Sequence, residues 1–344
     1  MKSSFSSTLR VIAVALIGLT SLVVLGGCAS GIAPIVAPKQ IPAVGSTSVV
    51  MATAFNATTN LFYTANGTEN TVSVFDGATN KLTATINVGS DPTGIAVNAV
   101  TNTIYVTNSL DSSLSVIDGA TNLVKATLTT VGDDPYAVVV NPVTNKVYVA
   151  EWVSGSAQNL YVVDCATNQV ASALTVGANV SALAINTKTN TIYAATMYSV
   201  AVINGSNDTV TATLAPSTPY QVPSGGIGVD ESTNIVYVAN TSFGPDTITA
   251  INGVTNQVIT TVDLGATAGS LAVNPVTHMV YVAINGATAL EVFSGATNTV
   301  VDSINLKYAA EDVTANATKN LLYVAEGSEV AVIDVAAGTT TDIP

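Results

Sequence analysis

One residue, His278, stands out as a candidate for acid–base or ligand chemistry, because it is the only histidine among 344 residues and an imidazole titrates near neutral pH. It closes the segment 274–278 (NPVTH), and the equivalent segment 141–145 (NPVTN) closes on Asn. His, like Asn, tolerates the left-handed backbone that such a turn requires. The pattern therefore favours a structural role for His278.

Nucleophilic chemistry has no better support. Cys165 replaces the Gly of a second recurring turn, residues 164–168 (DCATN), and no His or Arg lies nearby in the sequence to lower the pKa of its thiol. Serine is abundant, but with the single histidine placed in a turn no Ser-His-Asp arrangement can be assembled. We expect no catalytic residue of either type.

The elements that carry these residues recur along the chain. Seven Asn or His residues that close a recurring five-residue segment are each followed three residues later by Tyr, at intervals of 42, 43, 45, 44, 44 and 42 residues. Each unit holds four short β-branched or alternating segments, which in the second unit are residues 94–98, 104–107, 114–118 and 124–128. Such a period is typical of propeller blades. We predict an all-β fold, a seven-bladed β-propeller of four-stranded antiparallel blades, with the recurring pairs Asn60/Tyr63, Asn102/Tyr105, Asn145/Tyr148, Asn190/Tyr193, Asn234/Tyr237, His278/Tyr281 and Asn320/Tyr323.

Connection lengths divide the predicted propeller into two faces. We name the strands of a blade A to D from the axis outward. The A–B and C–D turns keep a constant length and share one face, the turn face, whereas the B–C and D–A connections vary and share the other, the loop face. Variable loops on a rigid scaffold are where binding residues gather. Which terminal strand completes the last blade stays open.

The segment 105–108 (YVTN) gives the chain its resemblance to a known family. It matches the motif of the YVTN-repeat β-propeller family, and degenerate copies stand at 148–151 (YVAE) and 237–240 (YVAN). The resemblance covers residues 47–344 and implies a seven-bladed propeller on an exported or surface protein of the cell envelope. The family has no common enzymatic activity, so the resemblance leaves the function open.

The N-terminus has the features of a lipoprotein signal peptide. A short basic start and an apolar run from Val11 to Leu25 end in Leu25-Gly26-Gly27-Cys28, which resembles a bacterial lipobox. We predict a signal peptide over 1–27, lipidation of Cys28, a flexible tether over 28–46 rich in Pro, and the propeller over 47–344. The protein would then be exported and lipid-anchored on the periplasmic or surface side, with the outer membrane as one option. The alternative is an ordinary signal peptide with an incidental Cys.

Charge excludes one class of partner. Without Lys2 and Arg10 the chain keeps seven Lys and no Arg against 22 acidic residues, a net charge of −15. Nucleic-acid binding depends on neutralising phosphates with Lys and Arg. We therefore expect no nucleic acid as a partner, and contact with the membrane only through the lipid anchor.

Aromatic and acidic residues of the variable connections are the candidates for ligand binding. Aromatic side chains in loops are enriched at interfaces, and acidic residues beside them favour a cationic or polymeric partner. The alternative is local packing over blade edges. The candidates are Tyr136, Trp152, Tyr198, Tyr220 and Phe243, with Asp133, Asp134 and Glu151.

Oxygen ligands at the ends of B strands raise the question of a metal. Carboxylate and amide oxygens suit a hard cation such as Ca²⁺, and related propeller lactonases hold such an ion near the axis. The candidates Asn108, Glu151, Asn240 and Glu326 lie one strand out from the axis, where turn chemistry explains Asn equally well. A quinone- or haem-bearing oxidoreductase lacks the expected axial His and clustered Arg.

We expect a monomeric, non-catalytic binding or scaffold module of the cell envelope that presents its loop face to a protein, polymer or small ligand, without a cofactor. The alternative is a metal-dependent, lactonase-like hydrolase on the same scaffold.

Overall fold

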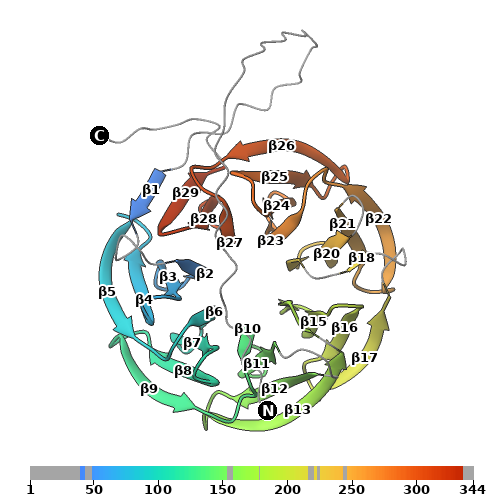
Figure 1. Ribbon diagram of the computed structural model, residues 1–344. Coiled ribbons are helices and arrows are strands. Elements are labelled where there is room, and N and C mark those ends of the chain that lie inside the picture. Colours follow the sequence, from blue (N-terminus) through green and yellow to red (C-terminus); the bar gives the residue numbers. More distant parts are fainter. Residues whose placement is uncertain are drawn as a thin grey trace, which may run out of the picture. The chain divides into compact units, whose positions relative to one another are not determined.

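The computed structural model describes residues 39–42, 49–152, 158–177, 179–215, 221–222, 225–242 and 246–335. Figure 1 shows seven sheets arranged as a ring, with inner strands such as β10, β23 and β27 toward the centre and outer strands such as β5, β9 and β26 on the rim. Each sheet is antiparallel, and in blades 1 to 6 the four main strands follow chain order from the inside out. The predicted seven-bladed propeller is confirmed. No helix in this part of the chain is long and apolar enough to cross a membrane.

The blades have these bounds. Blade 1 consists of β2 (Val50–Asn56), β3 (Leu61–Asn66), β4 (Thr71–Asp76) and β5 (Lys81–Asn87); blade 2 of β6 (Pro92–Asn98), β7 (Thr103–Asn108), β8 (Ser113–Asp118) and β9 (Leu123–Leu128); blade 3 of β10 (Pro135–Asn141), β11 (Lys146–Glu151), β12 (Gln158–Asp164) and β13 (Gln169–Gly177); and blade 4 of β14 (Ala182–Asn186), β15 (Thr191–Ala195), β16 (Val200–Asn204) and β17 (Thr209–Leu214). Blade 5 consists of β19 (Ile227–Asp230), β20 (Ile235–Ser242), β21 (Thr247–Asn252) and β22 (Gln257–Asp263), with β18 (Gln221–Val222) paired to the end of β20; blade 6 of β23 (Ala268–Asn274), β24 (Met279–Ile284), β25 (Ala289–Ser294) and β26 (Thr299–Asn305); and blade 7 of β27 (Ala310–Asn316), β28 (Leu321–Glu326), β29 (Glu329–Asp334) and β1 (Lys39–Pro42).

The hydrophobic core lies between neighbouring blades. One cluster, for example, joins Tyr63 and Val74 of blade 1 to Ile104 and Val106 of blade 2. All seven motif tyrosines are buried, none more than 3% exposed. In blade 6 the Gly of the C–D turn makes room for the tyrosine side chain of blade 5, since a Cβ at Gly295 would overlap the Tyr237 hydroxyl.

The turn face is built from one repeated device. Asn56 Oδ1 accepts hydrogen bonds from the backbone N–H groups of Thr58 and Thr59 (3.0 and 3.3 Å) and so fixes the A–B turn. The residue that closes this turn has a positive φ, between 50° and 58°, in every blade, His278 included. The predicted backbone role of these residues is confirmed.

The same side chains link each blade to the next. At six blade interfaces the residue that opens one A–B turn hydrogen-bonds the residue that closes the next blade's turn: Asn56–Asn102 (2.8 Å), Asn98–Asn145 (3.1 Å), Asn141–Asn190 (2.6 Å), Asn186–Asn234 (2.7 Å), Asp230–His278 (2.7 Å) and Asn274–Asn320 (3.0 Å). We call this set the turn-face ladder. At the interface of blades 7 and 1, Asn316 Nδ2 and Asn60 Oδ1 are both buried without a hydrogen-bond partner.

The ring closes through a strand from the N-terminal side. β1 pairs with β29 and becomes the outermost strand of blade 7, so blue and red strands lie side by side in Figure 1. β1 falls inside residues 28–46, for which a flexible tether was predicted. These four residues form a strand because their backbone groups pair with the free edge of β29. An aromatic stack also holds this seam, with Tyr323 4.3 Å from Phe62 and Phe62 4.6 Å from Phe75 between ring centres.

Candidate functional site: the central cavity

A cavity of about 390 Å³ lies at the loop-face end of the ring's centre. The first residues of the innermost strand of every blade line it, together with Trp152 and Asn285 from two B–C connections. Because each A strand runs from the loop face to the turn face, its sequence start sets the chemistry of this cavity.

A β-bulge supplies the lining residue in several blades. The A–B pairing shifts register between Val50 and Ala52 in blade 1, and the same shift occurs in blades 2, 3 and 7. A bulge leaves one extra residue and can redirect its side chain, often beside functional sites. The residue concerned always stands five places before the one that opens the A–B turn. We call it the bulge position; from blade 1 to blade 7 it holds Met51, Thr93, Tyr136, Ser181, Gly225, Gly269 and Glu311, all in the cavity wall.

Blade 3 gives the wall its aromatic part. Tyr136 and Trp152 lie with ring centres 5.4 Å apart and ring planes at 45°. They are 38% and 39% exposed, and both line the cavity. The backbone N–H of Trp152 donates to Asp134 O (2.8 Å), which fixes the connection that carries the indole.

Blade 7 gives the wall its acidic part. Asp312 is half-buried and accepts hydrogen bonds from Thr53 N (2.8 Å), Thr53 Oγ1 (3.1 Å) and Ser270 Oγ (2.6 Å), so it touches blades 1 and 6. Burial raises the pKa of the Asp312 carboxyl, against these hydrogen bonds, which lower it. Glu311 is exposed, and no described residue forms a hydrogen bond or ion pair with it. No Lys or Arg is among the described lining residues.

Comparison with known proteins identifies the family. A family model described as a YNCE-like beta-propeller matches residues 18–341. The chain belongs to the YNCE-like β-propeller family. Among solved structures it is similar to "Kuenenia stuttgartiensis Hydrazine Synthase", with a TM-score of 0.75 and 14% identity over 85% of this chain and 97% of that chain. At this identity the likeness shows the fold alone. Comparison with curated proteins gives no match.

The YNCE-like propeller brings together only some of the predicted ligand-binding residues. Tyr136 and Trp152 meet at the cavity, although Tyr136 belongs to β10 and not to a connection as predicted. Tyr198 is 64% exposed in the connection after β15 and is not part of the cavity wall. Tyr220, Phe243 and the lipidation candidate Cys28 lie outside the described residues.

The three predicted acidic candidates of blade 3 have different surroundings. Glu151 is only 8% exposed and accepts a hydrogen bond from Asn159 N (2.9 Å), so it holds the β11–β12 connection. Asp134 has φ 50° at the turn before β10, and burial raises the pKa of its carboxyl. Asp133 is exposed beside it. None of the three lines the cavity.

The four metal candidates lie in four different blades, and each takes part in hydrogen bonds. Among the described residues no group of three or more His, Cys, Asp or Glu is placed to hold a metal ion. The hydrogen bonds join Asn108 to Ser113 Oγ and Ser115 Oγ (both 3.0 Å), Glu151 to Asn159 N, Asn240 to Thr249 Oγ1 (2.9 Å), and Glu326 to Gln40 Nε2 (3.3 Å) and Tyr308 N (3.1 Å). These contacts give no support to a calcium-type ion, which stays a prediction.

His278 and Cys165 both lie in turns, away from the cavity. His278 Nδ1 lies 2.7 Å from Asp230 Oδ2 within the turn-face ladder. Cys165 is half-buried, and burial raises the pKa of its thiol, which keeps it protonated at neutral pH. Both residues fit the structural roles expected from their positions.

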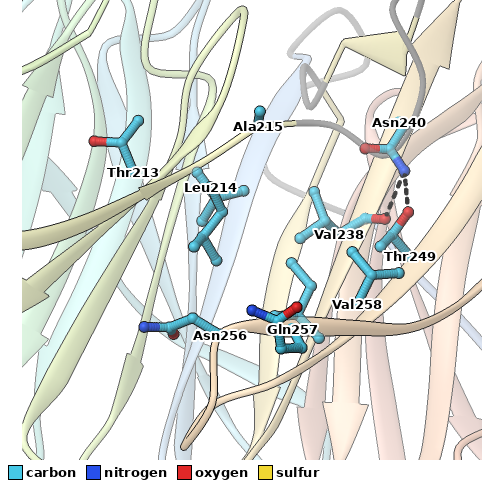
Figure 2. Close-up of a pocket in the computed structure, with 11 residues that line it drawn as sticks. Thr213, Leu214, Ala215, Val238, Asn240, Thr249, Asn256, Gln257 and Val258 are labelled. Carbon is cyan, nitrogen blue, oxygen red and sulfur yellow. Dashed lines mark hydrogen bonds between the residues drawn. The ribbon is translucent and has the colours of Figure 1, made fainter.

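A second hollow, of about 380 Å³, lies between blades 4 and 5 (Figure 2). At five other blade interfaces, an apolar residue just after the D strand belongs to the hydrophobic cluster between the two blades: Val88, Val131, Val180, Leu264 and Leu306. The corresponding cluster of blades 4 and 5 has none among the described residues. Figure 2 shows Asn240 turned toward Thr249 and Val238 O, and no charged or aromatic residue is among the described lining residues. The central cavity is therefore the stronger candidate.

The sequence analysis did not single out the two carboxylates of the cavity wall, Glu311 and Asp312. A comparison of the seven A strands would have found Asp312, because the residue four places before the turn opener is small in the other six blades: Ala52, Gly94, Ala137, Ala182, Gly226 and Ser270.

Proposed function

We propose that this YNCE-like propeller is a non-catalytic binding module that takes a ligand at the loop-face mouth of its central cavity. The observation that carries the proposal is the pair Tyr136–Trp152, two partly exposed aromatic rings that line a cavity formed by all seven blades. Aromatic side chains contribute most to binding where they fill a pocket at the centre of an interface. A cavity of this size with a few convergent polar groups is typical of ligand sites.

The proposal includes a location in the cell. The lipobox-like segment before Cys28 supports export and lipid anchoring in the cell envelope, with the monomeric propeller held at the membrane by acyl chains alone. A Cys28→Ser variant should stay unprocessed and should change its partition in detergent extraction. Cleavage at another site with Cys28 unmodified in the mature protein would refute the anchor.

The binding role can be tested with the only tryptophan of the chain. Because Trp152 lines the cavity, its fluorescence reports occupancy without a label. A ligand screen on the purified propeller should give a saturable change, and the Tyr136→Ala variant should bind about tenfold or more weakly by calorimetry.

A matched control separates the cavity from the rest of the loop face. Tyr198→Ala removes an aromatic residue of the same type from the same face but outside the cavity wall. The variant should bind as the wild type does. If Tyr198→Ala loses the ligand and Tyr136→Ala keeps it, the site lies on the outer loops and not in the cavity.

A further inference from the structure

The seven A strands give an internal standard for what the fold itself requires. Four places before the turn opener, six blades have a small residue. In two of them the inner strands leave no room for a side chain: a Cβ at Gly226 would come 2.5 Å from Leu271 N, and one at Gly94 would overlap Tyr136 O. Asp312 departs from this rule in blade 7. A residue that breaks a structural rule of its own repeat indicates a role beyond the fold.

The charge at this position is not neutralised by the protein. Hydrogen bonds from Thr53 and Ser270 satisfy part of the Asp312 carboxylate but bring no positive charge. The neighbouring bulge residue, Glu311, has no hydrogen-bonding or ionic partner in the described part of the chain. With no Lys or Arg among the described lining residues, the cavity favours a cation and disfavours an anion.

The aromatic part lies across the ring from the acidic part. Blades 3 and 7 are separated by three blades in one direction and two in the other, so Tyr136 and Trp152 lie on the wall opposite Glu311. A bare metal ion would leave the aromatic wall unused. A ligand that uses both walls has an apolar body and a positively charged end.

We propose that the cavity binds a small organic ammonium ion, with its N–H groups donating to Glu311 beside Asp312 and its apolar body against Tyr136 and Trp152. This ligand class rests on the proposed binding function and narrows it. A hydrogen bond to an unpaired carboxylate in a partly enclosed site is charge-assisted, and an aromatic wall adds contact area for the apolar body.

The test uses phenylalkylamines with two to six methylene groups and the matching phenylalkyl alcohols, titrated against Trp152 fluorescence. The series of lengths finds the separation of the two walls, and each alcohol keeps the body while removing the charge. At least one amine should saturate the signal and bind about tenfold or more tightly than its alcohol, which is the usual size of a hydrogen bond to a charged group. Calcium alone should not compete.

Two variants locate the charge. Glu311→Gln should weaken the amine about tenfold and leave the alcohol unchanged. Glu69→Gln makes the same change of charge on the loop face, at an exposed residue outside the cavity wall, and should leave both ligands unchanged.

Several results would overturn the inference: no saturable response to any amine, equal affinity for amine and alcohol, or equal effects of the two variants. A neutral or anionic ligand found at Trp152 by the wider screen would then leave the binding function standing. Failure of every ligand class at Trp152 would remove both.

Discussion

The turn face and the loop face start from the same repeat, yet they keep different parts of it. On the turn face, six interfaces carry the same side-chain hydrogen bond, and every closing residue has the same backbone conformation. On the loop face, the bulge position holds a Met, Thr, Tyr, Ser, Gly or Glu. Uniform position and backbone conformation across the blades therefore indicate a structural role, whereas the variable residues at the cavity are the candidates for binding.

Two aspartates show the contrast at a single residue type. Asp230 on the turn face lies against its own turn and His278; burial would raise the pKa of its carboxyl, but hydrogen bonds from Ser232 and His278 outweigh burial and lower it. Asp312 at the cavity has hydrogen bonds as well, but there burial prevails and the pKa is raised. The first carboxylate stabilises the fold as an anion, whereas the second is ionised at the expense of stability.

The largest expected difference is between two tyrosines. Tyr323→Ala removes a buried ring from the aromatic stack of the closing seam and should lower the free energy of unfolding by about 3–5 kcal/mol. Tyr136→Ala, at a partly exposed ring of the loop face, should change it by about 0.5 kcal/mol or less. Urea unfolding of both variants measures the difference. Similar losses would mean that Tyr136 is structural.

Two asparagines make the next comparison. Asn141→Ala removes a fully buried side chain that donates to Asn190 (2.6 Å) and accepts from Val143 N (3.0 Å), and should lower the free energy of unfolding by about 1–3 kcal/mol. Asn285→Ala changes an exposed loop-face amide and should stay within about 0.5 kcal/mol of wild type. An equal loss of unfolding free energy in both variants, measured by thermal or urea unfolding, would contradict the assignment of structural residues to the turn face and binding residues to the loop face.

The faces also differ in what sequence could foresee. The turns of the turn face could be predicted from local sequence, because Asn tolerates a positive φ and Asx side chains accept hydrogen bonds from the backbone two residues on. The position of His278 in the repeat was enough to place it in a turn. The cavity depends on packing between strands far apart in sequence. The partners of Asp312, Thr53 and Ser270, lie 259 and 42 residues away, and no local pattern brings them together. The closing strand was missed because β1 is four residues long and stands apart from any repeat.

A smaller effect tests the exception within the turn-face ladder. His278→Asn keeps the positive φ of 58° and a donor for Asp230, so stability should change by about 0.5 kcal/mol or less. His278→Val meets a backbone conformation unfavourable to a β-branched residue and should cost about 1–2 kcal/mol. Differential thermal unfolding compares the two. A functional loss in the Asn variant at unchanged stability would reveal a chemical role for the imidazole.

The smallest effect is a difference in the sign of a pH dependence. Asp230 has a folded pKa below its ordinary value of 3.8, so the unfolded chain binds more protons between the two pKa values. The stability that Asp230 contributes is therefore present above about pH 3.8 and is lost as pH falls through the folded pKa. Asp312 has a folded pKa above 3.8, so the folded chain binds more protons in its window, and stability is lost as pH rises through it. Unfolding midpoints of the wild type, Asp230→Asn and Asp312→Asn, measured across acidic to neutral pH, isolate the two contributions. The advantage of the wild type over Asp230→Asn should grow as pH rises, and its advantage over Asp312→Asn should shrink. Two slopes of the same sign would show that both carboxylates are simple structural anions, and the cavity would lose the feature that distinguishes it from the turn face.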